Sequence, residues 1–354
     1  MDVVDEALDL DRVLAWLDGA GIPLAPPVQA RLLAGGRSNL TFALDSADST
    51  SVVVRRPPLG HVLPSAHDMG REHRMLTRLH ARGFAVPAPI ALCEDTTVIG
   101  APFQVMEFVA GDVVATREQA DALGPEIAER VCASLVTTLA TLHAVPVTAD
   151  ETERAHGYLA RQVERWRSQW SLTQVEPLAD VDALADGVAE RIAALPPGRA
   201  GIVHGDYRID NVILDSLDHR VRAVVDWEMA TIGDPVADLG IALVYWTQGD
   251  DALRAQVPVS PGVTSAAGFW SRAQVWDAYR AQVDDPTLDS RIDAATALAC
   301  FKLAVIMESI RMRARRGEQR GVAAGEAGIE EATAALAALG LAVLRHGAIE
   351  GLRR

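Results

Sequence analysis

The change of pattern near residue 112 constrains the fold of this chain more than any other feature. Before residue 112, five short strand-like runs flank one helical stretch, and after it long helical segments are interrupted only by strand-like runs near 201–226. This order predicts an α+β protein with two lobes, an N-lobe over 1–109 and a larger helical C-lobe over 110–354. The predicted strands are 29–33, 40–45, 51–56, 89–94 and 103–108, and the predicted N-terminal helices are 5–19 and 65–82.

The composition narrows the possible partners. The chain has 33 basic and 48 acidic residues, and this balance disfavours nucleic acid, whose phosphates need a basic face. The three cysteines are far apart in the sequence, which argues against a disulfide framework and for a reducing cytoplasm. The acidic N-terminus does not resemble a signal peptide, and the uncharged stretch 131–149 is interpreted as a buried helix. We therefore expect a cytoplasmic protein with no membrane partner, while its oligomeric state is not predicted.

The lysine count excludes one class of nucleotide site. Lys302 is the only lysine, against 32 arginines. A mechanism that needs a lysine in the first 300 residues is therefore excluded, and the lysine-bearing P-loop is one of these.

The strongest chemical signal is a polar loop that runs from His204 to Asn211 between two predicted strands. Asn211 is predicted to open one strand of a hairpin, and Asp226 is predicted to close its second strand, 221–225. The first residue of one hairpin strand and the last residue of the next lie at the same end, and the loop that carries Asp206 leads into that end. The side chains of Asp206, Asn211 and Asp226 are therefore predicted to converge.

These three residue types suit phosphoryl transfer. Asn211 and Asp226 offer the hard oxygen ligands that Mg²⁺ prefers, and Asp206 is left to accept a proton from a hydroxyl, the arrangement of kinase-type enzymes. Acidic residues in a loop can also simply cap turns. The spacing of Asn211 after Asp206, together with the second aspartate, favours the catalytic interpretation, in which ATP and Mg²⁺ are the cofactors.

A second signal lies in the N-terminal part. Four residues of the predicted helix 65–82 fall on one face: Met69, Glu72, Leu76 and Leu79. Because a buried unpaired carboxylate costs several kcal/mol, Glu72 needs a counter-charge, and Arg55 at the end of a predicted strand is the best candidate. Arg56 is the alternative if the strand register differs by one residue. A protein kinase uses a strand lysine here, which also contacts the phosphates, so an arginine would take that role.

These motifs resemble the aminoglycoside phosphotransferase family of small-molecule kinases. More narrowly, the chain is similar to the branch fused to acyl-CoA dehydrogenases and to its free-standing bacterial relatives. The resemblance implies a two-lobed protein-kinase-like fold with a small, mainly antiparallel sheet in the N-lobe. It covers residues 28–245 continuously and is carried by stretches 35–39, 54–58, 63–67, 70–74, 100–111, 204–215 and 226–240.

The resemblance assigns roles residue by residue. It implies Asp206 as the catalytic base, Asn211 and Asp226 as the magnesium ligands, Ser38 and Asn39 in the loop over the phosphates, Arg55 with Glu72 at the nucleotide phosphates, Glu107 and Val109 at the adenine, and Asp238 as the buried acid that braces the catalytic loop. His204 is interpreted as a residue that packs and supports this loop. Antibiotic-modifying members have lysine at the position of Arg55, so this difference counts against aminoglycosides rather than against kinase activity.

The acceptor is predicted to be a hydroxylated small molecule. Too few residues separate Glu228 from Ala237 for the long activation segment with which protein kinases bind a peptide. Arginines between 272 and 320 favour an anionic acceptor, such as a hydroxy acid or hydroxyacyl-CoA, with Arg311 and Arg313 as its expected contacts. These arginines can instead simply offset a helix dipole. Two other functions are considered, an aminoglycoside or other antibiotic phosphotransferase and a nucleotide-binding pseudokinase.

Overall fold

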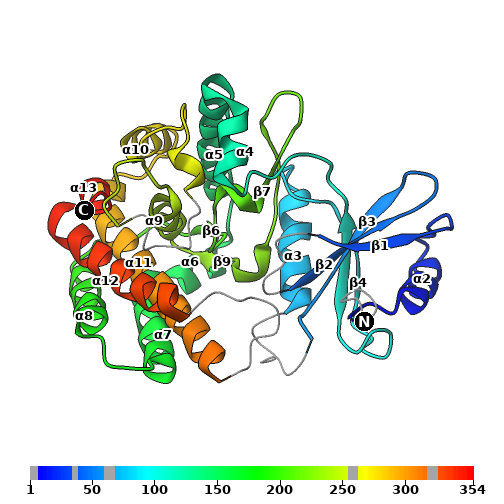
Figure 1. Ribbon diagram of the computed structural model, residues 1–354, viewed down its shortest axis with the longest axis horizontal. Coiled ribbons are helices and arrows are strands. Elements are labelled where there is room, and N and C mark those ends of the chain that lie inside the picture. Colours follow the sequence, from blue (N-terminus) through cyan, green and yellow to red (C-terminus); the bar gives the residue numbers. More distant parts are fainter. Residues whose placement is uncertain (1–6, 34–38, 60–67, 254–261, 317–325) are drawn as a thin grey trace. The chain divides into compact units, whose positions relative to one another are not determined.

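The computed structural model describes residues 7–33, 39–59, 68–253, 262–316 and 326–354, with no side chains described over 326–330. The chain forms two compact units (Figure 1). The first unit contains residues 1–112, 212–216 and 222–230, and the second contains 113–211, 217–221 and 231–354. The chain therefore returns to the first unit after the predicted catalytic loop.

The first unit is built on a five-stranded antiparallel sheet. Its strand order is β1-β2-β3-β5-β4, and the register places Arg55 opposite Thr41 on β2 and Gln104 on β5. The elements of this unit are α2 (Leu10–Gly19), β1 (Gln29–Leu32), β2 (Leu40–Asp45), β3 (Ser51–Arg56), α3 (Met69–His80), β4 (Pro89–Cys93), β5 (Phe103–Glu107), β7 (Val212–Leu214), β8 (Val221–Val224) and η2 (Trp227–Met229). The five predicted strands are confirmed to within one residue at each end.

The two faces of this sheet carry different side chains because strand residues alternate. On β3, Val52 and Val54 belong to a core cluster with Val13 and Leu17 of α2. Arg55 lies on the other face, where it contacts α3. The sheet thus separates an apolar layer under α2 from a layer under α3 that holds charged side chains.

The helices α2 and α3 of the first unit each begin directly after an aspartate. Asp9 and Asp68 are the N-caps of α2 and α3, and the Asp68 carboxylate accepts a hydrogen bond from the Arg71 backbone N–H at 2.9 Å. An aspartate at this position satisfies an amide that has no partner within the helix. The predicted starts at residues 5 and 65 lie outside the described residues.

A short hairpin carries Asp226 into the first unit. Its strands β7 and β8 pair with each other, the Leu214 backbone exchanges two hydrogen bonds of 2.8 Å with Asp112, and the Val224 N–H donates to the Ala85 carbonyl at 2.8 Å. Asn211 does not open β7 as predicted, because it ends a 3₁₀ turn directly before that strand.

The second unit is mainly helical and is organised around α11, which packs against α7, α8, α9 and α12 (Figure 1). Its elements are α4 (Arg117–Leu123), α5 (Pro125–Ala144), α6 (Ala149–Ala155), α7 (Tyr158–Thr173), α8 (Ala179–Ala193), β6 (Gly201–Val203), η1 (Ile209–Asn211), β9 (Thr231–Gly233), α9 (Val236–Tyr245), η4 (Val263–Ser265), α10 (Arg272–Arg280), α11 (Leu288–Arg315), α12 (Glu326–His346) and α13 (Ala348–Gly351). The strand β9, which pairs with β6, was not predicted.

Helix α9 approaches α11 closely at Gly240. A Cβ atom at this position would lie 2.7 Å from the Ala295 backbone, so a larger residue would push the two helices apart. The contact matters for the site because α9 carries Asp238 in its first turn and Tyr245 at its last residue.

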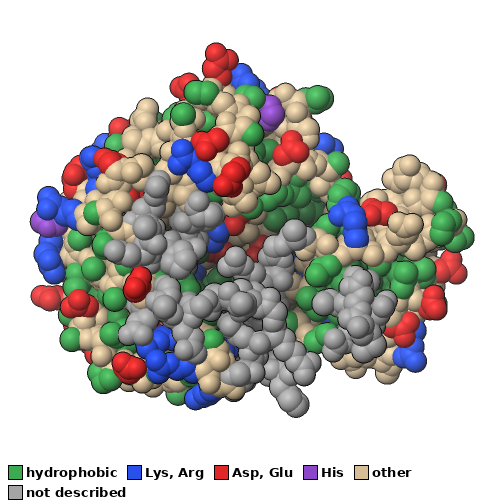
Figure 2. Space-filling model, in the orientation of Figure 1, with side chains coloured by type: hydrophobic (Ala, Val, Ile, Leu, Met, Phe, Trp, Pro, Cys, Tyr) green, Lys and Arg blue, Asp and Glu red, His purple; other side chains and the backbone are tan. Residues whose placement is uncertain are grey.

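The distribution of surface charge and the apolar character of the helices can be compared with the partners expected from the sequence. Acidic and basic side chains are interspersed over the face shown in Figure 2. In the described part of the chain, no single helix has the length and apolar character to cross a membrane, although the sharply bent pair α5–α6 passes such a test by length and composition. The interpretation of 131–149 as a buried helix and its exit agrees with α5, whose buried residues include Val131, Leu135 and Leu142.

Candidate active site

A charged cluster in the first unit surrounds Arg55. We call it the Arg55 cluster, and it consists of Arg55, Glu72, Asp226, Glu228 and Asn39. The Arg55 Nε lies 3.1 Å from Glu72 Oε1, its Nη2 donates to the Asp226 carboxylate, and the same nitrogen lies 3.6 Å from Glu228 Oε2. One guanidinium therefore serves three carboxylates.

The predicted pair Arg55–Glu72 is confirmed as a contact. The alternative, Arg56, lies on the opposite face of β3 and donates to the backbone carbonyls of Ala7 and Ile99 at 2.6 and 3.0 Å. The strand register therefore decides between two adjacent arginines, because only one of them faces α3.

Burial makes the Arg55 cluster electrostatically strong. The side chains of Arg55 and Glu72 are 10% and 3% exposed. Burial raises the pKa of Glu72, an effect partly offset by Arg55. Burial alone would lower the pKa of Arg55, but the carboxylates of Glu72, Asp226 and Glu228 raise it above its ordinary value. The guanidinium is thus charged, as phosphate binding requires.

Glu228 is held in the cluster by two hydrogen-bond donors. The buried Asn39 donates from Nδ2 to Glu228 Oε2 at 2.8 Å, and the Arg71 guanidinium donates to the Glu228 backbone carbonyl. Glu228 was not predicted as a site residue, although its position two residues after Asp226 could have suggested it. Ser38, predicted beside Asn39, lies outside the described residues.

The predicted adenine contacts lie at the end of β5. Glu107 is the last residue of this strand, and Val109 follows two positions later. The Glu107 backbone N–H donates to the Ala88 carbonyl at 2.9 Å, and its side chain accepts from the Ala88 N–H at 3.2 Å. The segment is therefore anchored on one side by Ala88, and a role in adenine binding stays a prediction.

The second unit holds the loop 204–211, and in it Asp206 and Asn211 are in contact. The Asn211 Nδ2 donates to the Asp206 backbone carbonyl at 2.9 Å and to its Oδ2 at 3.1 Å. Because the amide nitrogen is used in this way, Asn211 presents Oδ1, an oxygen of the kind that Mg²⁺ prefers. The donor set thus fits the predicted cation. Among the described residues no group of three His, Cys, Asp or Glu side chains forms a metal site by itself, so phosphate oxygens would have to supply further ligands.

Asp238 anchors the start of this loop. Its Oδ2 accepts from the His204 backbone N–H at 2.6 Å, and its Oδ1 accepts from the Gly205 N–H at 2.7 Å. The His204 Nδ1 in turn accepts from the Asp206 N–H at 3.2 Å. Burial alone would raise the pKa of Asp238, but the His143 hydrogen bond, the charges of His143 and His204 and the Gly205 N–H lower it. The predicted contact of Asp238 with the loop is confirmed.

Two residues that touch this loop were not predicted. The Tyr245 hydroxyl donates to Asp206 Oδ1 at 2.6 Å, and the Lys302 ammonium donates to the Gly205 carbonyl at 2.5 Å. Burial lowers the pKa of Lys302, and the charges of Asp206 and Asp238 oppose this effect. In the sequence, the only signals that these residues could reach the loop were the position of Tyr245 two turns after Asp238 and the fact that Lys302 is the single lysine.

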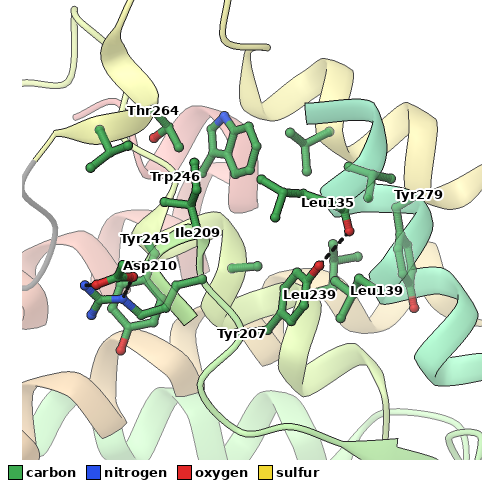
Figure 3. Close-up of a pocket in the computed structure, with 15 residues that line it drawn as sticks. Leu135, Leu139, Tyr207, Ile209, Asp210, Leu239, Tyr245, Trp246, Thr264 and Tyr279 are labelled. Atoms are coloured by element: carbon green, nitrogen blue, oxygen red, sulfur yellow. Dashed lines mark hydrogen bonds and ion pairs between the residues drawn. The ribbon is translucent and has the colours of Figure 1, made fainter. Parts of the chain in front are cut away.

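An apolar pocket of about 40 Å³ adjoins this loop (Figure 3). Its wall includes Tyr207 and Ile209 of the loop and Tyr245 of α9, and its apolar lining comes from α5, α9 and neighbouring segments. Among the described residues that line it, the only carboxylate belongs to Asp210, which pairs with the Arg208 guanidinium. The main apolar lining residues are Leu135, Leu139, Leu239, Trp246 and Val263.

The arginines expected at the acceptor differ in environment. Arg311 is 1% exposed and lies 3.3 Å from Glu308 Oε1 and 3.5 Å from Glu176 Oε1. Arg272 is likewise buried against Asp251, at 2.6 Å. Arg313 is exposed, and its Nε donates to the Ser309 carbonyl. The buried ion pairs count against acceptor binding by Arg311, and the role predicted for Arg313 stays a prediction.

Comparisons with known proteins place this geometry in a family. The model of the phosphotransferase enzyme family matches residues 29–281. Acyl-CoA dehydrogenase family member 11 of Gallus gallus is 36% identical over 64% of the chain, which spans 29% of that relative's length. Viomycin phosphotransferase of Streptomyces vinaceus is 30% identical over 53% of the chain and 62% of its own length.

A solved structure agrees with these relatives. A Ralstonia eutropha protein assigned to the aminoglycoside phosphotransferases has a TM-score of 0.73 and 26% identity, over 95% of this chain and 98% of its own. This similarity confirms the predicted protein-kinase-like fold of α+β class. Since the family model spans more than half of the sequence, the chain belongs to the phosphotransferase enzyme family.

Proposed function

We propose that this chain is an ATP-dependent phosphotransferase that moves the γ-phosphate of ATP to a hydroxyl group of a small molecule. In this proposal Asp206 accepts the proton of the hydroxyl, and Asn211 and Asp226 hold Mg²⁺. The observation that carries the proposal is the carboxylate of Asp206, which is hydrogen-bonded through both oxygens in a loop whose backbone is anchored by Asp238.

The first unit supplies the features expected for a nucleotide. Arg55 is charged and is held by carboxylates rather than by backbone carbonyls, so its side chain is suited to bind both a carboxylate and a phosphate. Bound Mg²⁺ neutralises negative charge on the phosphates. Asp226 is 30% exposed and carries the charge that such an ion needs.

The apolar pocket supports a particular class of acceptor. A cavity of about 40 Å³ accommodates about three methylene-sized groups, by comparison with the volume that a water needs. We infer an acceptor that combines its hydroxyl with a short aliphatic segment, as a hydroxy acid or a hydroxyacyl-CoA does. The relatives named as acyl-CoA dehydrogenase family members favour the thioester.

The test is a screen for ADP release from ATP over hydroxylated metabolites, with and without Mg²⁺. Hydroxy acids and hydroxyacyl-CoAs with acyl chains of increasing length form the central series. We expect Mg²⁺-dependent turnover with short-chain members, and its loss in the Asp206→Asn variant. Nucleotide binding without turnover on any acceptor would indicate the pseudokinase instead.

A second candidate function is resistance to an aminoglycoside or another antibiotic. It is favoured by the identity with viomycin phosphotransferase. A polycationic drug needs several carboxylates in its pocket, whereas the described lining has one, which is already paired. Drug susceptibility of a strain that expresses the chain distinguishes this candidate, because only a resistance enzyme would raise the inhibitory concentration.

A further inference from the structure

Tyr245 connects the apolar pocket to the proposed base. Its ring contributes to the pocket wall, as Figure 3 shows, and its hydroxyl donates to Asp206 Oδ1 at 2.6 Å. The residue comes from the last turn of α9, 39 positions after Asp206 in the sequence. An acceptor that fills the pocket and presents a hydroxyl to Asp206 must therefore pass beside this side chain.

The carboxylate of Asp206 is held from two directions. Tyr245 donates to Oδ1, and Asn211 donates to Oδ2 at 3.1 Å. A carboxylate accepts about four hydrogen bonds, so two donors fix its plane and leave other lone pairs for an acceptor hydroxyl. A general base works best when a further group fixes its orientation.

Tyr245 is itself held in place. The Arg208 guanidinium lies over its ring, 4.6 Å from the centroid, and Arg208 is paired with Asp210 in the loop. Burial raises the pKa of Tyr245 well above its ordinary value, and the charge of Asp206 raises it further. The hydroxyl therefore stays protonated and acts as a donor at neutral pH.

We propose that Tyr245 is a positioning residue that orients the Asp206 carboxylate to take the proton of the acceptor hydroxyl. This inference rests on the proposed function. In the transfer, the acceptor oxygen forms a bond to the γ-phosphorus of ATP, the bond from phosphorus to the departing ADP oxygen breaks, and the acceptor proton moves to Asp206. Tyr245 keeps its own proton throughout, so Tyr245→Phe removes orientation and leaves the base in place.

The contact is tested without turnover, by ultraviolet titration of the tyrosines. The chain has four tyrosines. The Tyr245 hydroxyl donates to Asp206, and burial and the charge of Asp206 both raise the pKa of Tyr245. By contrast, the Tyr207 hydroxyl donates to the Leu135 carbonyl, and the Tyr279 hydroxyl lies 2.6 Å from His143 Nδ1. In Asp206→Asn one tyrosine should titrate at lower pH than in the wild type. Adding Tyr245→Phe should abolish this component, and adding Tyr158→Phe should retain it. An unchanged titration in Asp206→Asn overturns the inference.

The positioning role is tested by kinetics with Mg²⁺ and ATP, with water as the acceptor. Tyr245→Phe should lower kcat roughly 10-fold or more, the value of one hydrogen bond to a charged group, with the KM for ATP unchanged. Tyr158→Phe is the control for the loss of a buried phenol. Undiminished kcat in Tyr245→Phe overturns the positioning role. Undiminished ADP release in Asp206→Asn overturns the proposed function, and the positioning role with it.

Discussion

The Arg55 cluster and the loop 204–211 hold their functional side chains in different ways. In the first, one guanidinium faces three carboxylates, so formal negative charge is in excess by two. In the second, Asp206 is held by the neutral donors Tyr245 and Asn211, and two backbone N–H groups donate to Asp238. The Lys302 ammonium contacts the backbone carbonyl of Gly205 in this loop.

This difference indicates a division of labour. An excess of buried carboxylate is unfavourable by itself, and cations relieve it, so the Arg55 cluster is suited to bind a magnesium nucleotide. Neutral donors fix a carboxylate without neutralising it, so Asp206 remains able to accept a proton. Variants in the cluster should thus change nucleotide affinity and stability, while variants in the loop should change the rate.

The largest expected effect is that of Asp206→Ala. Loss of a positioned general base should lower kcat roughly 10²–10⁴-fold, while the Kd for ATP should stay the same because the Arg55 cluster is intact. ADP release and calorimetric titration measure the two quantities. Asp215→Ala is the control, since this carboxylate pairs with Arg222 on the hairpin at 3.5 Å. Loss of ATP binding with a normal rate at saturation would contradict the assignment.

The next effect concerns the stability of the Arg55 cluster. Arg55→Ala leaves three neighbouring carboxylates without their cation and should lower the unfolding free energy by about 3–5 kcal/mol. Glu72→Ala leaves Arg55 with Asp226 and Glu228 and should cost only about 1–3 kcal/mol. Urea denaturation of both variants and of the double variant tests the pair, because residues in contact are not additive. Equal losses in the two single variants, or strict additivity, would show that Arg55 does not hold the cluster together.

The contacts of the first unit were largely predictable from the sequence. A two-residue period places Arg55 and Arg56 on opposite faces of β3, and a helical period places Glu72 among apolar residues. Periodicity therefore suggested this pair, while the choice between Arg55 and Arg56 needed the strand register that the structure supplies. The third partner, Asp226, enters the cluster through the pairing of β7 with β8 and the contacts of this hairpin with Ala85 and Asp112, which no local pattern encodes.

The loop was predictable only in part. The spacing from Asp206 to Asn211 is local, and the two side chains are in contact. Tyr245 and Lys302 reach the loop because α9 and α11 pack closely at Gly240, and packing between distant helices leaves no short motif in the sequence. Similarly, the strand β9 is only three residues long and is stabilised by pairing with β6 rather than by its own propensity.

Asp226→Asn should change both nucleotide affinity and the rate of turnover. The change keeps the size of the side chain but removes the negative charge, so Mg²⁺-dependent nucleotide binding should weaken, and turnover should fall by roughly 10²-fold as metal stabilisation of several kcal/mol is impaired. Titration with Mg²⁺ at fixed ATP measures both. Glu228→Gln is the matched control, because it removes the same charge from the same cluster at a residue not proposed as a ligand. An equal loss of nucleotide binding and turnover in both variants would show that the effect comes from the missing charge and not from a metal ligand at Asp226.

The smallest expected effect concerns Lys302, whose contribution to stability should depend on pH. Lys302 donates to the Gly205 carbonyl, so Lys302→Met should change the unfolding free energy by only about 1 kcal/mol at neutral pH, the value of one hydrogen bond.

Burial lowers the pKa of Lys302 in the folded state below its ordinary value of 10.5. Between the folded and the unfolded pKa the unfolded chain therefore binds more protons than the folded chain. The contribution of this lysine to stability must then rise with pH in that window. Lys302→Met lacks this rise, and so does Lys302→Arg, because a guanidinium does not lose its proton there. Urea denaturation from neutral pH up to 10.5 gives the comparison. Parallel pH profiles for the wild type and both variants would show that the Lys302 ammonium carries no burial penalty.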